Sequence, residues 1–300
     1  MSMMEVNMNK KNKNSMLVAG LLLAGSFMWF GNVAMITSIF QEPKSEGVTE
    51  DNSNYVYRKL PNTAFQEGEK LNFRVHYGII NAANIQMEVV ADNQLFSRPE
   101  ELKGRKAFHV VVQGSTIKAF DWAFKVRDRF DSWIDEDALA PLKYSKSVLE
   151  NNYTDQDLVY YRHVSGKLNG KKGNLDIPSY TQDIASALYY ARNIEFKNAK
   201  VGESFPIDVY LDNEIYNLNF KYLGVETIKS DIGKVKCYKL KPRLVVDRVF
   251  KGEDDMTVWI SADENKIPIR VQSDIQVGSL KVDLTSYSGL RNNFDAKLKK

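Results

Sequence analysis

The feature that most constrains the fold of this chain is the repetition of three short motifs. The first is a Gly-Glu pair that opens an alternating run, the second is a glycine and a basic residue before a strand-like run, and the third is a Trp-Ile pair followed by an acidic turn and a proline. They recur in the same order, about 130 positions apart, at residues 68–75 and 202–209, 104–105 and 233–234, and 133–143 and 259–270. We therefore expect two related halves, each too exposed to fold alone.

Both halves show the period-two alternation of half-buried β-strands. In the first run Leu71, Phe73 and Val75 share one face, while Asn72 and Arg74 lie on the other. Similar runs, separated by turns, continue to residue 287. Each half is therefore expected to form one antiparallel β-meander of about five or six strands.

One segment, residues 181–193, has the period of a helix instead. Its apolar side chains form one stripe: Ile184, Ala187, Leu188 and Ala191. Ser179 or Thr181 is a suitable cap for its start. We therefore predict a mainly β, antiparallel fold in which two duplicated β-meanders form a curved sheet or an open or half barrel, with one linking helix near residues 181–193.

The N-terminal 41 residues have the chemistry of an export signal. Three lysines between positions 10 and 13 precede an uncharged segment whose apolar core spans residues 16–30. Two interpretations stay open: a signal peptide cleaved near residues 24–26, or an uncleaved anchor that spans a bilayer core of about 30 Å. Both predict an exported protein.

This signal and the repeated motifs define the expected domain organisation. Residues 1–41 form the signal peptide or membrane anchor, and the polar residues 42–66 form a linker. A single β-rich domain spans residues 67–290 and consists of two halves, 67–178 and 200–290, that the helix joins. Residues 291–300 form a lysine-rich tail.

Composition and motifs argue against several classes of function. The 41 basic and 38 acidic residues nearly balance, so nucleic acid is not an expected partner. Cys237 is the only cysteine, which excludes an intrachain disulfide and a cysteine cluster for zinc. His76, His109 and His163 lack metal-ligand spacing, and no serine-nucleophile or phosphate-binding motif occurs. We therefore expect no metal, no cofactor and no catalytic residue.

The densest run of aromatic and charged residues spans positions 120–143. Its first part, residues 120–129, has no counterpart in the second half, whereas residues 133–143 belong to a repeated motif. The structural interpretation of that motif is that its Trp packs over the hairpin partner strand. We predict an apolar ligand site formed by five aromatic residues: Phe120, Trp122, Phe124, Trp133 and Trp259. A polar site is predicted at four charged residues: Asp121, Arg127, Asp128 and Arg129.

The aspartates of this run allow a second interpretation. Asp121, Asp128 and Asp131 would supply the acid and base of a hydrolase acting on cell-wall glycan or lipid, if two of them converge in one cleft. The structural alternative is that Asp128, which the alternation places among apolar residues, pairs with Arg74 or Arg248.

Three stretches together resemble a known family. Residues 68–78 have the sequence Gly-Glu-Lys-Leu-x-Phe-x-Val-x-Tyr-Gly, residues 120–129 have Phe-Asp-Trp-x-Phe-Lys-Val-Arg-Asp-Arg, and Trp259-Ile260-Ser261 is followed by Ile267-Pro268. The pattern resembles the uncharacterised bacterial envelope family called domain of unknown function (DUF) family 3108. The resemblance covers most of residues 67–287 and implies an exported, β-rich protein of the bacterial periplasm or envelope. It implies no activity.

These observations lead to one expected function and two alternatives. We expect an exported, non-enzymatic envelope protein that binds an apolar or amphipathic small molecule, or an envelope protein, on its curved β surface. The alternatives are the carboxylate-dependent hydrolase and a structural envelope scaffold that binds partners but no ligand. Contact with the membrane is expected only through the N-terminal segment.

Overall fold

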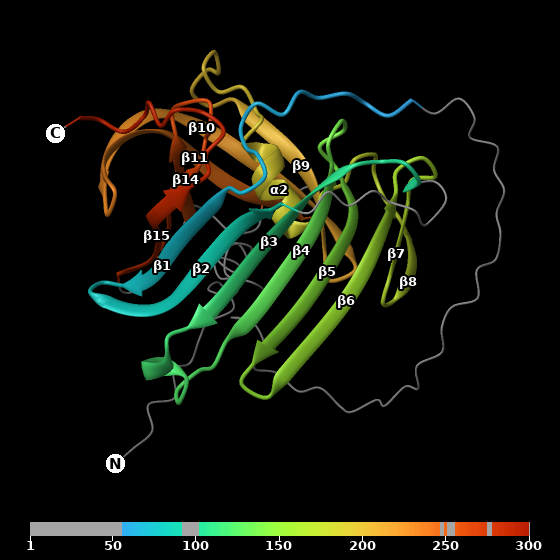
Figure 1. Cartoon of the computed structure of the whole chain (residues 1–300), viewed down its shortest axis with the longest axis horizontal. Coiled ribbons are helices and arrows are strands. Elements are labelled where there is room, and N and C mark those ends of the chain that lie inside the picture. Colours follow the sequence, from blue (N-terminus) through green and yellow to red (C-terminus); the bar gives the residue numbers. More distant parts are fainter. Residues whose placement is uncertain (1–55, 92–101, 247–248, 251–255, 275–277, 300) are drawn as a thin grey trace.

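The computed structural model describes residues 56–91, 102–246, 249–250, 256–274 and 278–299, most of which form one antiparallel sheet that curves around a short helix (Figure 1). The strands are β1 (Lys70–Tyr77), β2 (Ile80–Val90), β3 (Ala107–Thr116), β4 (Arg127–Asp135), β5 (Pro141–Glu150), β6 (Tyr153–Arg162), β7 (Lys167–Gly170), β8 (Gly173–Asp176), β9 (Ser204–Leu211), β10 (Glu214–Ser230), β11 (Gly233–Val246), β12 (Val249–Phe250), β13 (Met256–Ser261), β14 (Pro268–Asp274) and β15 (Ser279–Ser288). The predicted export segment, residues 1–41, lies outside the described residues. Within the described part of the chain, no helical segment has both the length and the hydrophobicity of a transmembrane span.

The sheet consists of two meanders placed side by side. Its strand order is β8-β7-β6-β5-β4-β3-β2-β1-β15-β14-β13-β11-β10-β9, and the short β12 pairs with β11. We call β1–β6 the N-terminal meander, and β9–β11 with β13–β15 the C-terminal meander. They join where β15 pairs with β1, and the β7-β8 hairpin extends the sheet beyond β6. The prediction of two antiparallel meanders in one curved sheet is therefore confirmed.

The repeated Trp-Ile motif forms the same hairpin in each meander. In both copies the strand register shifts between the tryptophan and the isoleucine, at Trp133 on β4 and at Trp259 on β13. Both turns also place a non-glycine residue in the left-handed region, Leu139 with φ 49° and Lys266 with φ 46°. The sequence repeat is thus also a repeat of backbone geometry.

An aspartate side chain holds each of these two turns. Asp135 Oδ1 accepts hydrogen bonds from the backbone N–H groups of Asp137 and Ala138, at 3.0 and 2.7 Å. Asp263 Oδ1 accepts the corresponding bonds from Asn265 and Lys266, at 3.1 and 3.2 Å. The acidic turn recognised in the sequence therefore stabilises a left-handed residue that would otherwise be unfavourable.

The helix α2 (Ile184–Ala191) is shorter than predicted and has a different cap. Asp183 is the N-cap, because its Oδ1 accepts hydrogen bonds from the backbone N–H groups of Ala185 and Ser186, both at 2.8 Å. The predicted cap Thr181 instead donates its hydroxyl to the carbonyl of Pro178, so the prediction of Ser179 or Thr181 as the cap was wrong. Asp183 also accepts a hydrogen bond from Ser132 of β4 at 2.6 Å, which fixes the start of α2 against the N-terminal meander.

The ends of the sheet do not close into a hydrogen-bonded ring, because β8 and β9 remain its edges. Gln182, which precedes the Asp183 cap, links edge strand β9 to the N-terminal meander. It exchanges backbone hydrogen bonds with β9, and its side chain donates to the carbonyl of Leu139 at 3.2 Å. Lys146 of β5 also forms an ion pair with Asp212, in the turn between β9 and β10, at 2.6 Å. The helix segment and side chains therefore connect the ends of the curve.

Candidate functional site

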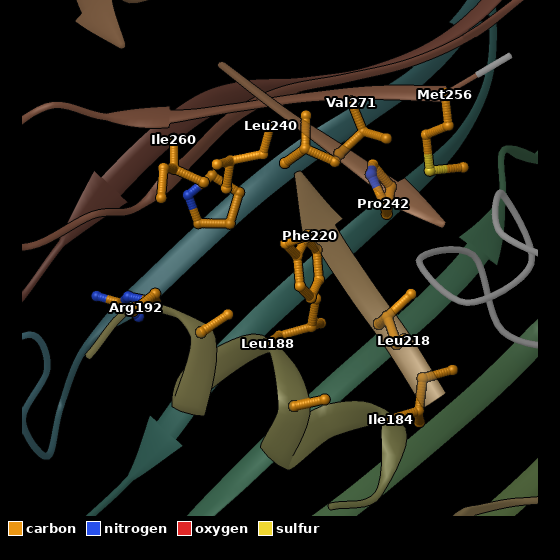
Figure 2. Close-up of a pocket in the computed structure, with 14 residues that line it drawn as sticks. Ile184, Leu188, Arg192, Leu218, Phe220, Leu240, Pro242, Met256, Ile260 and Val271 are labelled. Atoms are coloured by element: carbon orange, nitrogen blue, oxygen red, sulfur yellow. The ribbon is translucent and has the colours of Figure 1, made fainter. Parts of the chain in front are cut away.

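An apolar hollow lies between α2 and the concave face of the C-terminal meander (Figure 2). The space open to the centre of a water-sized sphere is about 60 Å³, and the whole hollow, including its opening to solvent, is about 700 Å³. Fourteen residues line it: Ile184, Ala187, Leu188, Ala191, Arg192, Leu218, Phe220, Leu240, Pro242, Met256, Val258, Ile260, Pro268 and Val271. All of them except Arg192 are apolar.

The sequence builds this hollow from two periodicities. The apolar stripe of α2 lies on one wall, and it is the stripe that the helical period predicts. The alternate residues of β10 and β13 that face inward form the opposite wall, with Leu218 and Phe220 on the first and Val258 and Ile260 on the second. Because two of the helix residues are alanines, the side chains of the two walls do not fill the space between them.

Arg192 lies at one end of the hollow, and its charge is neutralised within the protein. Its guanidinium is fully buried and forms a bidentate ion pair with Glu69, at 2.5 and 2.7 Å. Further hydrogen bonds reach the carbonyls of Ala64 and Asn265, both at 3.0 Å. Burial lowers the pKa of Arg192, but the charge and hydrogen bonds of Glu69 outweigh this effect and raise it. Arg192 therefore joins the two meanders and offers the hollow no unpaired charge.

The structure does not bring the five predicted aromatic residues together. Phe120, Trp122 and Phe124 lie in the connection between β3 and β4, where Trp122 is 86% exposed. Trp133 and Trp259 lie on strands of different meanders, and both point to the convex face, away from α2. None of the five lines the hollow.

Both tryptophans have partners on the convex face. The ring of Trp133 stacks on His109 at 4.4 Å, and the Lys143 ammonium lies 4.1 Å from its centre. The ring of Trp259 has Lys239 at 5.5 Å, and its indole N–H donates to Glu226 at 3.1 Å. Lys143 lies on β5, the hairpin partner of β4, as the structural interpretation expects for Trp133. The contacts of Trp259 are instead with β11 and β10, which are not the hairpin partner of β13.

Of the four predicted polar residues, only Asp121 and Arg127 pair with each other. Asp121 accepts hydrogen bonds from Arg127 at 2.6 Å and from Thr116 at 2.7 Å, and the Arg127 hydrogen bond is the main reason that the pKa of Asp121 is lowered. Arg129 donates to Asp131 at 2.7 Å on the convex face. Asp128 is buried on the concave side, where it accepts a hydrogen bond from the backbone of Leu149 at 3.1 Å.

The aspartates of the hydrolase alternative therefore have three different surroundings: a turn, the concave face and the convex face. Of the two partners suggested for Asp128, Arg74 pairs with Asp231 at 2.8 Å, and Arg248 lies outside the described residues. The described part of the chain also contains no cluster of three or more metal-ligating side chains. Cys237 is buried, which raises the pKa of its thiol to about 12 and makes it a poor nucleophile.

Sequence reasoning identified one wall of the hollow and missed the other. The helical stripe was visible as a period, but nothing local indicates which strands face it. That information resides in the long-range pairing of β10, β11, β13 and β14. The inward residues of those strands, such as Leu218 and Val258, look like ordinary core positions in the sequence.

Comparison with known proteins gives the family of the chain. The model of a family described as a protein of unknown function (DUF3108) matches residues 72–285. The chain belongs to the DUF3108 family. This agrees with the resemblance found in the sequence. No curated protein matches this DUF3108 chain.

Solved structures similar to this DUF3108 protein share little sequence with it. A beta-barrel-like protein of domain of unknown function DUF1849 from Brucella abortus has 9% identity and a TM-score of 0.46, over 77% of this chain and 98% of that one. A candidate lipoprotein from Parabacteroides distasonis has 9% identity and a TM-score of 0.33, over 78% and 100%. A candidate exported protein with YmcC-like fold from Bacteroides fragilis has 12% identity and a TM-score of 0.32, over 78% and 100%.

Proposed function

We propose that this DUF3108 protein is an exported, non-enzymatic envelope protein that holds the apolar part of a small molecule in the hollow between α2 and the C-terminal meander. The observation that carries this proposal is the chemistry of the wall, in which the one polar side chain, Arg192, is already paired with Glu69. Export is supported by the basic and apolar N-terminal segment.

The wall selects for apolar surface and against charge. Each square ångström of apolar surface that a ligand removes from water contributes roughly 25 cal/mol, whereas a polar group buried there without a partner costs roughly 1–3 kcal/mol. The ligand class that fits is an amphipathic molecule whose apolar chain enters the hollow while its polar end stays at the opening.

A bulky substitution inside the hollow tests this function. Leu188 lines the hollow and is only half-buried, so Leu188→Trp adds volume there without replacing a core side chain. Leu158 of β6 is 49% exposed and does not line the hollow, so Leu158→Trp is the matched control. The measurement is the titration of each variant with a dansyl-labelled fatty acid, followed by dansyl fluorescence.

We expect the original chain and Leu158→Trp to bind the probe with equal affinity, and Leu188→Trp to bind it at least about tenfold more weakly, because a tenfold loss requires only 1.4 kcal/mol of excluded contact. Equal affinity of all three proteins would place the probe elsewhere and contradict the proposal. Circular dichroism and urea unfolding confirm that both variants are folded before binding is compared.

A further inference from the structure

Three strand connections at the same end of the N-terminal meander, between β1 and β2, β3 and β4, and β5 and β6, expose apolar side chains. The β1-β2 turn carries Ile79, which is 98% exposed, and Ile80, which is 50% exposed. The β3-β4 connection carries Trp122 at 86%, and the β5-β6 turn ends at Tyr153, which is 59% exposed. All three turns lie along the lower edge of the sheet in Figure 1. We call these residues, with Tyr77, the apolar rim.

Backbone hydrogen bonds join the three turns into one row. The N–H of Ile117, at the start of the β3-β4 connection, donates to the carbonyl of Ala82 beside the first turn at 3.0 Å. At the other side, the N–H of Asn151 donates to the carbonyl of Lys125 at 2.8 Å, and the Asn151 side chain accepts from the N–H of Lys125 at 2.8 Å. The exposed side chains therefore belong to one ordered surface and not to three independent tips.

The rim has the composition of a membrane-interface surface. Its central connection, residues 117–127, carries Lys118, Lys125 and Arg127 against Asp121 alone, and Lys118 and Lys125 are exposed. Glu150 beside the third turn is half-buried. Isoleucine and tryptophan side chains enter the boundary between headgroups and acyl chains, while flanking lysines remain with anionic headgroups.

One end of the hollow lies level with the strand ends that carry the rim. Met256, which lines the hollow, pairs with Ser273 of β14, Ser273 pairs with Leu280 of β15, and Leu280 pairs with Tyr77 at the end of β1. This row of paired residues connects one end of the hollow to the rim. Arg192 and its partner Glu69 lie at the other end, since Glu69 immediately precedes β1.

We propose that the apolar rim docks on a lipid bilayer with anionic headgroups, with Ile79 and Trp122 inserted into the interface. This assigns a role to residues 120–129, the segment that the duplication does not repeat, and it adds a membrane contact beyond the N-terminal segment. It does not depend on the hollow holding a ligand.

Site-specific labelling of the full chain tests the docking. Cys237 is fully buried, so a thiol-reactive fluorophore reacts selectively with a cysteine introduced at the surface. Ile79→Cys places the label on the rim, and Val201→Cys places it on the opposite edge, before β9, where Val201 is 73% exposed. Each labelled chain is incorporated into vesicles of phosphatidylethanolamine and phosphatidylglycerol, and quenching by iodide is measured.

We expect the label at position 79 to be quenched at least about threefold less in vesicles than in detergent-free buffer, with a blue-shifted emission, and the label at 201 to change little. Replacing phosphatidylglycerol by phosphatidylcholine is expected to weaken this protection, and K118Q with K125Q to remove that lipid dependence.

Three outcomes would overturn the proposal. Equal quenching of both labels in vesicles would leave the rim free in water, available to a protein partner. Equal protection of both labels would indicate burial by the N-terminal anchor alone. Protection that appears without lipid and increases with protein concentration would assign the rim to contact between copies of the chain. The fatty-acid titration of Leu188→Trp does not involve the rim, so failure of one proposal is distinguishable from failure of the other.

Discussion

The two meanders share a hairpin design, but their concave faces meet different sides of the same helix. On the N-terminal side, the fully buried Tyr189 packs edge-on against Phe65 at 4.9 Å, and Phe65 packs against Phe108 of β3 at 5.1 Å. On the C-terminal side, α2 presents Ala187 and Ala191, and the hollow remains. The repeated hairpins therefore supply the scaffold, and the asymmetry of one helix leaves the hollow.

This comparison explains why the strands alone do not define the function. The Trp-Ile hairpins have the same register shift in both meanders, yet the hollow described above lies against the C-terminal meander. The contacts that hold α2 in place decide how much space remains on its alanine side. Substitutions that loosen α2 from one meander should therefore affect the chain differently from substitutions in the repeated hairpins.

The largest effect is expected from Arg192→Met, which breaks the ion pair that joins both meanders to α2. Glu69 would remain buried without its partner, and a loss of about 3–5 kcal/mol in the free energy of unfolding is expected. Urea denaturation measures this loss. Lys70→Met is the matched control, because Lys70 pairs with Glu88 at 2.9 Å near the surface and should contribute about 0–1 kcal/mol.

The double variant Glu69→Leu with Arg192→Met sharpens this prediction. Removing both charges leaves no unpaired ion, so the double variant should be more stable than Arg192→Met alone. If Arg192→Met and Lys70→Met lower the free energy of unfolding by the same amount, the buried ion pair does not hold the helix between the meanders.

A smaller, pH-dependent effect is expected at Asp183, which caps α2 against the N-terminal meander. Burial raises its pKa from 3.8 to about 6, so the folded chain binds the proton more tightly than the unfolded chain. The stability that results is fully present below pH 3.8 and is lost as the pH rises through about 6. Asp183→Asn also caps the helix but does not titrate. Relative to this variant, the free energy of unfolding of the original chain should rise by about 3 kcal/mol when the pH is lowered from 7.5 to 3.5.

Asp131, on the convex face, provides the control of opposite sign. Burial would raise its pKa, but hydrogen bonds from His109 and Arg129 outweigh burial and lower it. Its stabilising effect is present above pH 3.8 and is lost as the pH falls through its lowered folded-state pKa. Urea unfolding of Asp183→Asn and Asp131→Asn across this range should show differences from the original chain that change in opposite directions. A parallel change would contradict the assignment.

The smallest effect is expected in the duplicated hairpins themselves. Trp259 donates its indole N–H to Glu226, whereas the indole N–H of Trp133 has no hydrogen-bond partner among the described residues. Trp259→Phe should therefore cost about 0.5–1.5 kcal/mol more than Trp133→Phe, toward the lower value because Glu226 is partly exposed. A double-mutant cycle with Glu226→Ala isolates this hydrogen bond. A coupling energy of zero would show that the hairpins are energetically equivalent.

Much of the fold could be predicted from the sequence, because its signals are local. Each Trp-Ile hairpin is predicted from residues of a single hairpin, 133–143 or 259–270. The α2 stripe is predicted from residues within about two helical turns of one another. The cap was missed because Ser179, Thr181 and Asp183 are all good capping residues, and the contact of Asp183 with Ser132 on β4 selects among them.

The candidate site was harder to predict, because it depends on long-range pairing. Alternation puts Trp133 and Ile134 on opposite faces, but it does not say which face becomes concave. Only the pairing of β15 with β1 and the position of α2 show that the isoleucine faces inward and the tryptophan outward. The helical spacing of Ile117, Phe120 and Phe124 predicts a short helical turn, and the structure has a 3-10 helix at Lys118–Phe120. That spacing does not show which surface of the protein the turn lies on.

Native mass spectrometry of the full chain released from its own envelope tests the central claim most directly. We expect the original chain and Leu158→Trp to carry an added mass that is released on denaturation and extracts into organic solvent, and Leu188→Trp to lack it. An original chain that carries no added mass, or a Leu188→Trp variant that retains it in full, would contradict the assignment of the hollow beside α2 as the ligand site.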